Sequence, residues 1–191
     1  SVRGGDSLVF DAIFTPDSRG FCSVGVQHIK FHEIRGRNIA TKKGIIGHEK
    51  QALLQTFLTV GYAGEFAVAG TTDGCLYKFD GRNLETVVKE AHDGLINTIF
   101  TGEDRIITGG YDGKVKVWSS PDLDVVAEFD LIKLGCFSPI CTAVFLSFDH
   151  SMVLAGTQGS EIFEILAKDG TNVHGAGKGP IVQGHCADQL W

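Results

Sequence analysis

The residues of this sequence that could do chemistry together are His92, Thr108 and Asp112. A hydroxyl, an imidazole and a carboxylate are the groups of a nucleophilic triad, in which the imidazole takes the proton of the attacking hydroxyl. The same groups can instead form a structural network, because a buried imidazole needs a partner at both nitrogens and the indole N–H of Trp118 can complete the set. We favour the network, since Thr108 falls in the middle of an expected strand, where a nucleophile is poorly presented.

The candidate network belongs to one of four segments that resemble one another. Each has an apolar strand, a glycine-containing tight turn and an alternating strand, over residues 21–34, 66–79, 106–118 and 152–165. The anchoring glycines Gly25, Gly70, Gly110 and Gly156 are 70 − 25 = 45, 110 − 70 = 40 and 156 − 110 = 46 residues apart. A period of about 40 to 45 residues is typical of the four-stranded blades of a propeller.

The strands expected around these segments make the fold class all-β. Apolar runs at 8–14, 51–60, 95–100 and 140–145 can serve as innermost strands, and 84–89 and 125–130 as outer strands. Helical periodicity is nowhere sustained, and Val, Ile, Phe and Thr are frequent in the runs. Asp73-Gly74 and Asp112-Gly113 supply the positive φ angles that tight hairpin turns require.

Composition narrows the classes of partner. The 17 Lys and Arg residues and 23 Asp and Glu residues give a net charge of 17 − 23 = −6, which argues against a nucleic-acid partner. No run approaches 18 apolar residues, so no membrane association is expected. The five cysteines form no CxxC pair and are odd in number, which fits a reducing, cytoplasmic setting. The first residues also lack an initiator Met, which suggests a piece of a longer protein.

No metal or cofactor site is expected. His28 and His32 lie on one face of an expected strand, but no third or fourth ligand is identifiable. Cys136 and Cys141 do not have zinc spacing. The stretch 175–179, Gly-Ala-Gly-Lys-Gly, leads into a strand, whereas a phosphate-binding loop leads into a helix.

Several segments, which together touch nearly the whole chain, carry a family resemblance: 25–34, 42–47, 51–60, 90–94, 155–165 and 183–191. They resemble the WD-repeat superfamily and, more narrowly, the echinoderm microtubule-associated protein-like family, above all its long members with paired propellers. The resemblance implies a non-catalytic scaffold that binds tubulin, microtubules or axonemal proteins. The implied location is the cytoplasm and cytoskeleton, with the cilium or axoneme as a further site. It also identifies His92, Thr108, Asp112 and Trp118 as the structural network of one blade.

The period and the resemblance divide the chain into WD-repeat β-propeller blades over residues 8–47, 48–91, 92–135 and 136–184, with the start of a fifth at 185–191. Rings of this type have about seven blades, so about four blades make an incomplete ring. The rest of the polypeptide or a second copy would then cover the open sheet edges. In the other blades His32, Phe79 and Ile165 stand where Trp118 stands, and Ala69 replaces Thr108. We therefore expect those blades to depend on apolar packing.

Two surfaces are candidates for partner binding. One is a rim of turn and loop residues: Thr72, Asp93, Tyr111, Thr157 and Asp188. The other is a basic cluster, Arg35, Arg37, Lys42 and Lys43, which could meet acidic tubulin tails or could simply be a solvated connection. Two other functions remain open at this stage, an adaptor in an unrelated complex and a propeller enzyme. The inner strands offer Asn97 and Thr142 to a central channel, but no set of acids or histidines.

Overall fold

The computed structural model describes residues 7–47, 53–174 and 179–184, which fold into four antiparallel sheets of four consecutive strands each. The first sheet contains β1 (Val9–Phe14), β2 (Gly20–Gly25), β3 (His28–Arg35) and β4 (Asn38–Lys43). The second contains β5 (Phe57–Ala63), β6 (Phe66–Thr71), β7 (Leu76–Asp80) and β8 (Asn83–Val88). The third contains β9 (Ile96–Thr101), β10 (Arg105–Gly110), β11 (Lys114–Ser119) and β12 (Val125–Asp130). The fourth contains β13 (Cys141–Leu146), β14 (Met152–Thr157), β15 (Glu161–Leu166) and β16 (Val182–Gln183).

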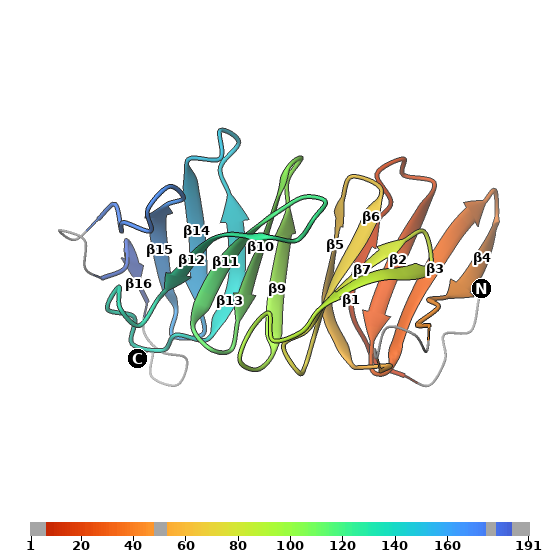
Figure 1. Ribbon diagram of the computed structural model, residues 1–191, viewed down its shortest axis with the longest axis horizontal. Helices are drawn as coiled ribbons and strands as arrows, with labels where there is room; N and C mark the ends of the chain where they lie inside the picture. Colours follow the sequence, from red (N-terminus) through yellow and green to blue (C-terminus); the bar gives the residue numbers. More distant parts are fainter. Residues whose placement is uncertain (1–6, 48–52, 175–178, 185–191) are drawn as a thin grey trace.

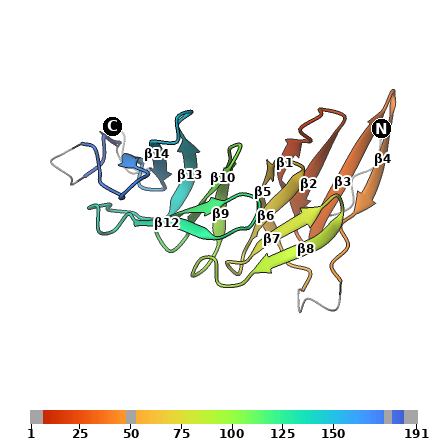
Figure 2. The ribbon, with the colours of Figure 1, turned by 45° about the horizontal axis from the view of Figure 1, so that its top comes forward.

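The four sheets lie side by side in sequence order, with the first and the last at opposite ends of the row (Figure 1). A second direction of view keeps the same order (Figure 2). The first strand of each sheet contacts the first strand of the next, from β1 to β5, β5 to β9 and β9 to β13. Sheets that meet through their first strands are successive blades of a β-propeller. The predicted all-β propeller class is confirmed.

The four blades share an irregularity that shows them to be one repeated unit. In each, the pairing of the innermost strand with the second strand shifts register at the same place, near Val9, Phe57, Ile96 and Cys141. A shift of this kind is a β-bulge, which bends the strand and increases its twist. All four innermost strands therefore bend at equivalent positions along the inner side of the row.

The bulge also corrects the alignment of the repeats. Gly25 and Gly110 pair with the first residue of their inner strands, Val9 and Ile96. In the second and fourth blades that position is held by Thr71 and Thr157, while Gly70 and Gly156 lie one residue earlier. The spacings of the true equivalents are thus 71 − 25 = 46, 110 − 71 = 39 and 157 − 110 = 47. An alignment of the repeats on glycine is therefore wrong by one residue in the second and fourth blades. The third blade has two adjacent glycines, Gly109 and Gly110, and the alignment used the second where the first is the equivalent.

Apolar side chains fill the three spaces between successive blades. Cys22, Val24 and Ile29 of the first blade pack against Phe57, Tyr77 and Phe79 of the second. Val68 and Leu76 of the second blade pack against Ile96, Ile106 and Trp118 of the third. Ile107, Val115 and Val117 of the third blade pack against Val153, Phe163 and Ile165 of the fourth. Alternate residues of each strand thus serve different interfaces, as the period of two along a strand requires.

The strand boundaries differ from the expected ones mainly in the second blade. Its innermost strand begins at Phe57, six residues later than the run of 51–60 suggested, because the bulge and the pairing with β6 fix the register. The outer strand expected at 125–130 is β12, with those bounds. Gly113 has φ = 75° in the turn between β10 and β11, a conformation that glycine adopts without strain. The expected fifth blade, 185–191, lies outside the described residues.

The outward faces of the first and fourth blades carry exposed apolar side chains. Phe14 is 64% exposed on the first blade, and Leu154 is 39% exposed on the fourth.

In the part of the chain that the structure describes, no helix is long and apolar enough to cross a membrane.

Candidate interaction surfaces

The third blade brings together the four residues of the candidate network. The Nδ1 atom of His92 lies 3.0 Å from Oδ1 of Asp112, and its Nε2 atom lies 2.7 Å from Oγ1 of Thr108. The indole of Trp118 donates its Nε1–H to the same Thr108 oxygen over 2.9 Å. Since Thr108 accepts this bond, its own proton can go to Nε2 of His92, which leaves an Nδ1–H to donate to Asp112. With the protons placed in this way, every polar side-chain atom of His92, Thr108 and Trp118 has a partner.

Burial decides between the network and the triad. Thr108 is 0% exposed, Trp118 is 1% exposed and His92 is 3% exposed. A nucleophile must reach its substrate, and a hydroxyl with no exposed surface does not. The geometry therefore supports a structural network at this place.

The carboxylate of Asp112 ties the turn to the preceding loop. Besides the contact with His92, it accepts the backbone N–H groups of Asp93 and Lys114 at 3.0 and 3.1 Å. Burial alone would raise the pKa of Asp112, but the hydrogen bonds from His92 and from the two amides outweigh it and hold this pKa below its usual value. Asp112 is therefore a charged anchor for the turn.

The first blade builds a related network from different residues. His32 occupies the position of Trp118, and its Nε2 atom lies 2.9 Å from Oγ of Ser23, which stands where Thr108 stands. The Nδ1 atom of His32 lies 2.9 Å from Oγ1 of Thr41. The ring also stacks on Phe21 with centroids 4.3 Å apart. Because hydroxyls engage both ring nitrogens, His32 is not placed as a metal ligand.

His28 fills the space that His92 fills in the third blade. A Cβ atom at Gly110 would lie 2.3 Å from Nδ1 of His92, and one at Gly25 would lie 2.7 Å from Cε1 of His28. At Gly110 the imidazole is the nearest group to such a Cβ atom, whereas at Gly25 the backbone carbonyl oxygen of Leu8 is nearer still, at 1.9 Å, so neither position has room for a side chain. Burial, opposed by a bond to the Val26 carbonyl, lowers the pKa of His28 and keeps it neutral. Among the residues that the structure describes, no group of three or more His, Cys, Asp or Glu side chains could hold a metal ion.

The second blade ties its turn to the preceding loop with Asp73, which lies two residues after Thr71 as Asp112 lies two residues after Gly110. Its carboxylate accepts hydrogen bonds from the amide of Gln55 at 2.6 Å and from the hydroxyl of Thr71. Gln55 thus binds the acid of the turn in the second blade, as His92 does in the third.

The fourth blade uses Glu161, the first residue of β15, which is only 2% exposed. Its carboxylate accepts the thiol of Cys136 at 2.9 Å, the N–H groups of Phe137 and Ser138, and the hydroxyl of Thr157. The expectation that blades without the tryptophan depend on apolar packing is wrong in this respect. In the second, third and fourth blades a carboxylate ties the turn between the second and third strands to the preceding loop, from Asp73 and Asp112 at equivalent positions and from Glu161 at another. Alignment of the repeats does not reveal Glu161 as the counterpart of the two aspartates, because it lies at a different position.

The candidate rim is only partly exposed. Tyr111 is 53% exposed, and the loop of Asp93 and Gly94 lies against it, since a Cβ atom at Gly94 would lie 3.6 Å from Cβ of Tyr111. Thr72 is partly buried. Thr157 is 7% exposed and donates to Glu161, so its place on the rim is corrected: it belongs to the buried anchor. Asp188 lies outside the described residues.

The four cations of the basic cluster do not form one patch. Arg35 pairs with Glu33 at 2.8 Å, and both side chains are largely exposed. Arg37 is exposed in the turn between β3 and β4. Lys42 and Lys43 are neighbours on β4 and point to opposite faces of the sheet, pairing with Phe31 and Lys30 respectively. The idea of a single cluster is corrected, because consecutive strand residues alternate between faces.

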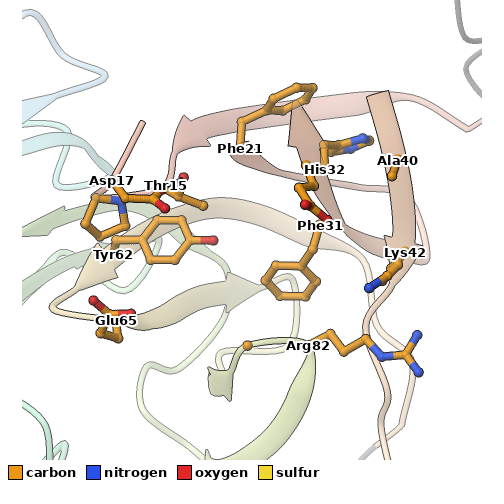
Figure 3. A pocket seen from close by; sticks show the side chains of 13 residues that line it. Thr15, Asp17, Phe21, Phe31, His32, Ala40, Lys42, Tyr62, Glu65 and Arg82 are labelled. Carbon is orange, nitrogen blue, oxygen red and sulfur yellow. Dashed lines mark hydrogen bonds between the residues drawn. The ribbon is translucent and has the colours of Figure 1, made fainter. Parts of the chain in front are cut away.

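A cavity of about 380 Å³ lies between the first two blades and contains one of these cations (Figure 3). Lys42 and Arg82 lie at one side of it, beyond Phe31, while Asp17, Glu65 and Tyr62 lie at the other side (Figure 3). Burial raises the pKa of Tyr62, so its phenol stays protonated at neutral pH. The cavity is therefore basic at one end and acidic at the other.

Comparisons with known proteins point in one direction. No family model matches the chain. The chain is 29% identical over 146 residues to the mouse (Mus musculus) Cilia- and flagella-associated protein 44, which covers 69% of this chain and 8% of that protein. It is 23% identical over 191 residues to the Ciliary WD repeat-containing protein ctxp80 of Euplotoides octocarinatus, covering 100% of this chain and 23% of that protein. The chain thus spans less than a quarter of the length of either relative.

A solved structure shows the same fold. A chain in the crystal structure of a mitotic checkpoint complex matches 90% of this chain with a TM-score of 0.71 at 13% identity, and 52% of that chain is covered. At 13% identity this match is evidence for the fold and not for a function. The four repeated blades and this match show a β-propeller fold, and the chain is similar along its whole length to a ciliary WD-repeat protein.

Proposed function

We propose that this chain is a non-catalytic interaction module of a microtubule-associated protein, which binds tubulin, microtubules or axonemal proteins through its propeller surfaces. The observation that carries the proposal is the similarity to a ciliary WD-repeat protein along all 191 residues of the chain. The name of a second relative also refers to cilia and flagella. The segments that resemble the echinoderm microtubule-associated protein-like family support the same reading, and the cilium or axoneme is the proposed location.

The described sites favour binding over catalysis. The hydroxyl, imidazole and carboxylate that could form a triad are locked in a buried network. Exposed aromatic and charged side chains, such as Tyr111, Lys42 and Arg82, lie instead on turns and blade edges. Aromatic and arginine side chains are the residue types that most often anchor protein interfaces.

Co-sedimentation of the purified chain with microtubules and with salt-washed axonemes tests this function. We expect the wild-type chain to enter the pellet, with a bound fraction that falls as salt rises. Reversal of Lys42 and Arg82 together to Glu should weaken binding to microtubules about fivefold, because tubulin tails are acidic. The matched control reverses Lys133, which is 83% exposed in the loop between β12 and β13 and does not line this cavity. A wild-type chain that stays in the supernatant with both polymers would contradict the proposal.

A second prediction concerns the rim. Tyr111→Ser should weaken binding to the same polymer at least fivefold, because an exposed aromatic at a turn can fill a pocket of the partner. The free energy of unfolding should change by less than about 0.5 kcal/mol, since the side chain is 53% exposed. Sedimentation and urea titration of the same preparation measure the two effects. Unchanged binding would remove Tyr111 from the interface.

A further inference from the structure

A second cavity, of about 700 Å³, opens where the first turns of all four blades approach one another. Its lining comes from the turn after β1, the end of β5, and the turns after β9 and β13. Pro16 and Tyr62 line both this cavity and the smaller one of Figure 3, so the two adjoin. None of the four residues of the third-blade hydrogen-bond network lines this larger cavity.

The floor of this larger cavity is aromatic. Phe100 and Phe145 contact each other with ring centroids 4.5 Å apart, and Tyr62 and Leu146 lie beside them in the lining. Phe145 is 49% exposed, and Phe148, in the turn after β13, is fully exposed. Folding gains nothing from a fully exposed phenylalanine, and gathered exposed apolar side chains mark binding sites more often than chance contacts do.

The rim of the cavity is acidic. The turns that form it carry five carboxylates: Asp17, Glu65, Glu103, Asp104 and Asp149. Arg19 and His150 lie in the same turns, and Arg105 is the first residue of β10. Asp104 is matched by Arg105 at 3.2 Å and by His150 at 3.0 Å. The rim therefore remains negative after its ion pairs are counted.

Two of these acids are charged across the physiological range. Hydroxyl and amide hydrogen bonds from Ser147 and Ser151 lower the pKa of Asp149 to about 2. The hydroxyl of Thr15 and the amide of Arg19 lower the pKa of Asp17. Figure 3 shows Asp17 and Glu65 above and below Tyr62, which lines both cavities.

We propose that this aromatic cavity binds a peptide segment rich in Lys and Arg that inserts one large apolar side chain between Phe100, Phe145 and Phe148. The inserted group would stack on the aromatic floor, and its basic neighbours would face Glu65 and Glu103 on the rim. An anionic lipid surface or a nucleic acid is disfavoured here, because the rim and the whole chain, with a net charge of −6, repel them. The proposal rests on the proposed role as an interaction module and adds the chemistry of one partner.

Fluorescence anisotropy with a synthetic probe tests the site on the whole 191-residue chain. The probe is a labelled peptide with one central tryptophan flanked on both sides by lysines, and two matched peptides replace the tryptophan by alanine or the lysines by glutamates. We expect saturable binding of the first peptide that weakens at least tenfold with either replacement, because both the apolar contact and the charge are used. No binding of the tryptophan–lysine peptide, or equal binding of the glutamate peptide, would overturn the proposal.

Substitutions in the chain locate the peptide. Phe148→Ser should weaken binding about tenfold or more, and Glu103→Lys about fivefold with a smaller salt dependence. Two matched controls lie at the opposite end of the strands from the cavity. Phe137→Ser replaces an 81% exposed phenylalanine in the loop before β13, and Glu90→Lys reverses an exposed acid in the loop before β9. Because Phe148 has no buried surface to lose, its variant should fold as the wild type does. Equal losses in the Phe148 and Phe137 variants would show that the peptide binds elsewhere.

The outcome separates this site from the proposed function. Peptide binding that depends on Phe148, in a chain that does not pellet with microtubules or axonemes, would leave the cavity standing and remove the proposed polymer partner. Pelleting that Phe148→Ser does not affect, together with absence of peptide binding, would do the reverse. A cavity filled by a second copy of the chain would appear as absence of peptide binding, which overturns the proposal.

Discussion

Replacement of Trp118 by alanine is expected to lower the free energy of unfolding by about 3–5 kcal/mol. The indole is 1% exposed and packs between the second and third blades against Val68, Leu76 and Ile106. Its loss leaves a cavity and also removes the donor to the Thr108 hydroxyl. Because stable domains have only about 5–15 kcal/mol in total, this change should bring the chain close to unfolding, as urea denaturation followed by circular dichroism would show.

A milder variant separates packing from hydrogen bonding. Thr108→Val keeps the volume of the side chain but removes the oxygen that lies between His92 and Trp118. It should cost about 1–3 kcal/mol, because two buried polar groups lose a partner. Val125→Ala, at a 53% exposed position of β12 in the same blade, should cost less than about 0.5 kcal/mol. If Thr108→Val behaved like Val125→Ala, the network would contribute nothing to stability.

Replacement of Glu161 by alanine is expected to lower the free energy of unfolding by about 3 kcal/mol. The lost carboxylate leaves the amides of Phe137 and Ser138 and the thiol of Cys136 without their acceptor in a buried place. The loop before β13 should loosen first, which hydrogen exchange at these two amides can follow. Glu128→Ala is the matched control, since Glu128 is an exposed acid that pairs with Lys114 and Lys116, and exposed pairs contribute about 1 kcal/mol or less.

The same glutamate predicts a dependence of stability on pH. Burial alone would raise the pKa of Glu161, but the bonds from Cys136, Phe137 and Ser138 outweigh it, so its pKa in the folded chain lies below the unfolded value of about 4.3. A lowered pKa stabilises the folded state above the unfolded pKa, and this contribution is lost as the pH falls through the folded value. Glu161→Gln should therefore lose less stability than the wild type between pH about 5 and pH about 3. Parallel acid titrations of the two proteins would contradict this assignment.

Much of the architecture could be read from local sequence. The alternation of apolar residues and the glycine-containing turns recur with each blade, so the strand pairs β2–β3, β6–β7, β10–β11 and β14–β15 follow from short segments. The residues that stand in place of Trp118 were also assigned correctly, since His32, Phe79 and Ile165 pair across the second strand as Trp118 pairs with Ile106. The one-residue offset of the repeats was missed, because it depends on bulges formed only when the innermost strand pairs.

The sequence by itself determined the fold class, the period of the blades and the members of the third-blade network, because these depend on residue type and spacing along the chain. Only the tertiary structure decided which side chains are accessible. It buried Thr157 beside Glu161, sent Lys42 and Lys43 to opposite faces, and gathered Tyr62, Phe100, Phe145 and Phe148 from three blades into one cavity. Contacts between blades join residues that are far apart along the chain, and such contacts leave no periodic signal in the sequence.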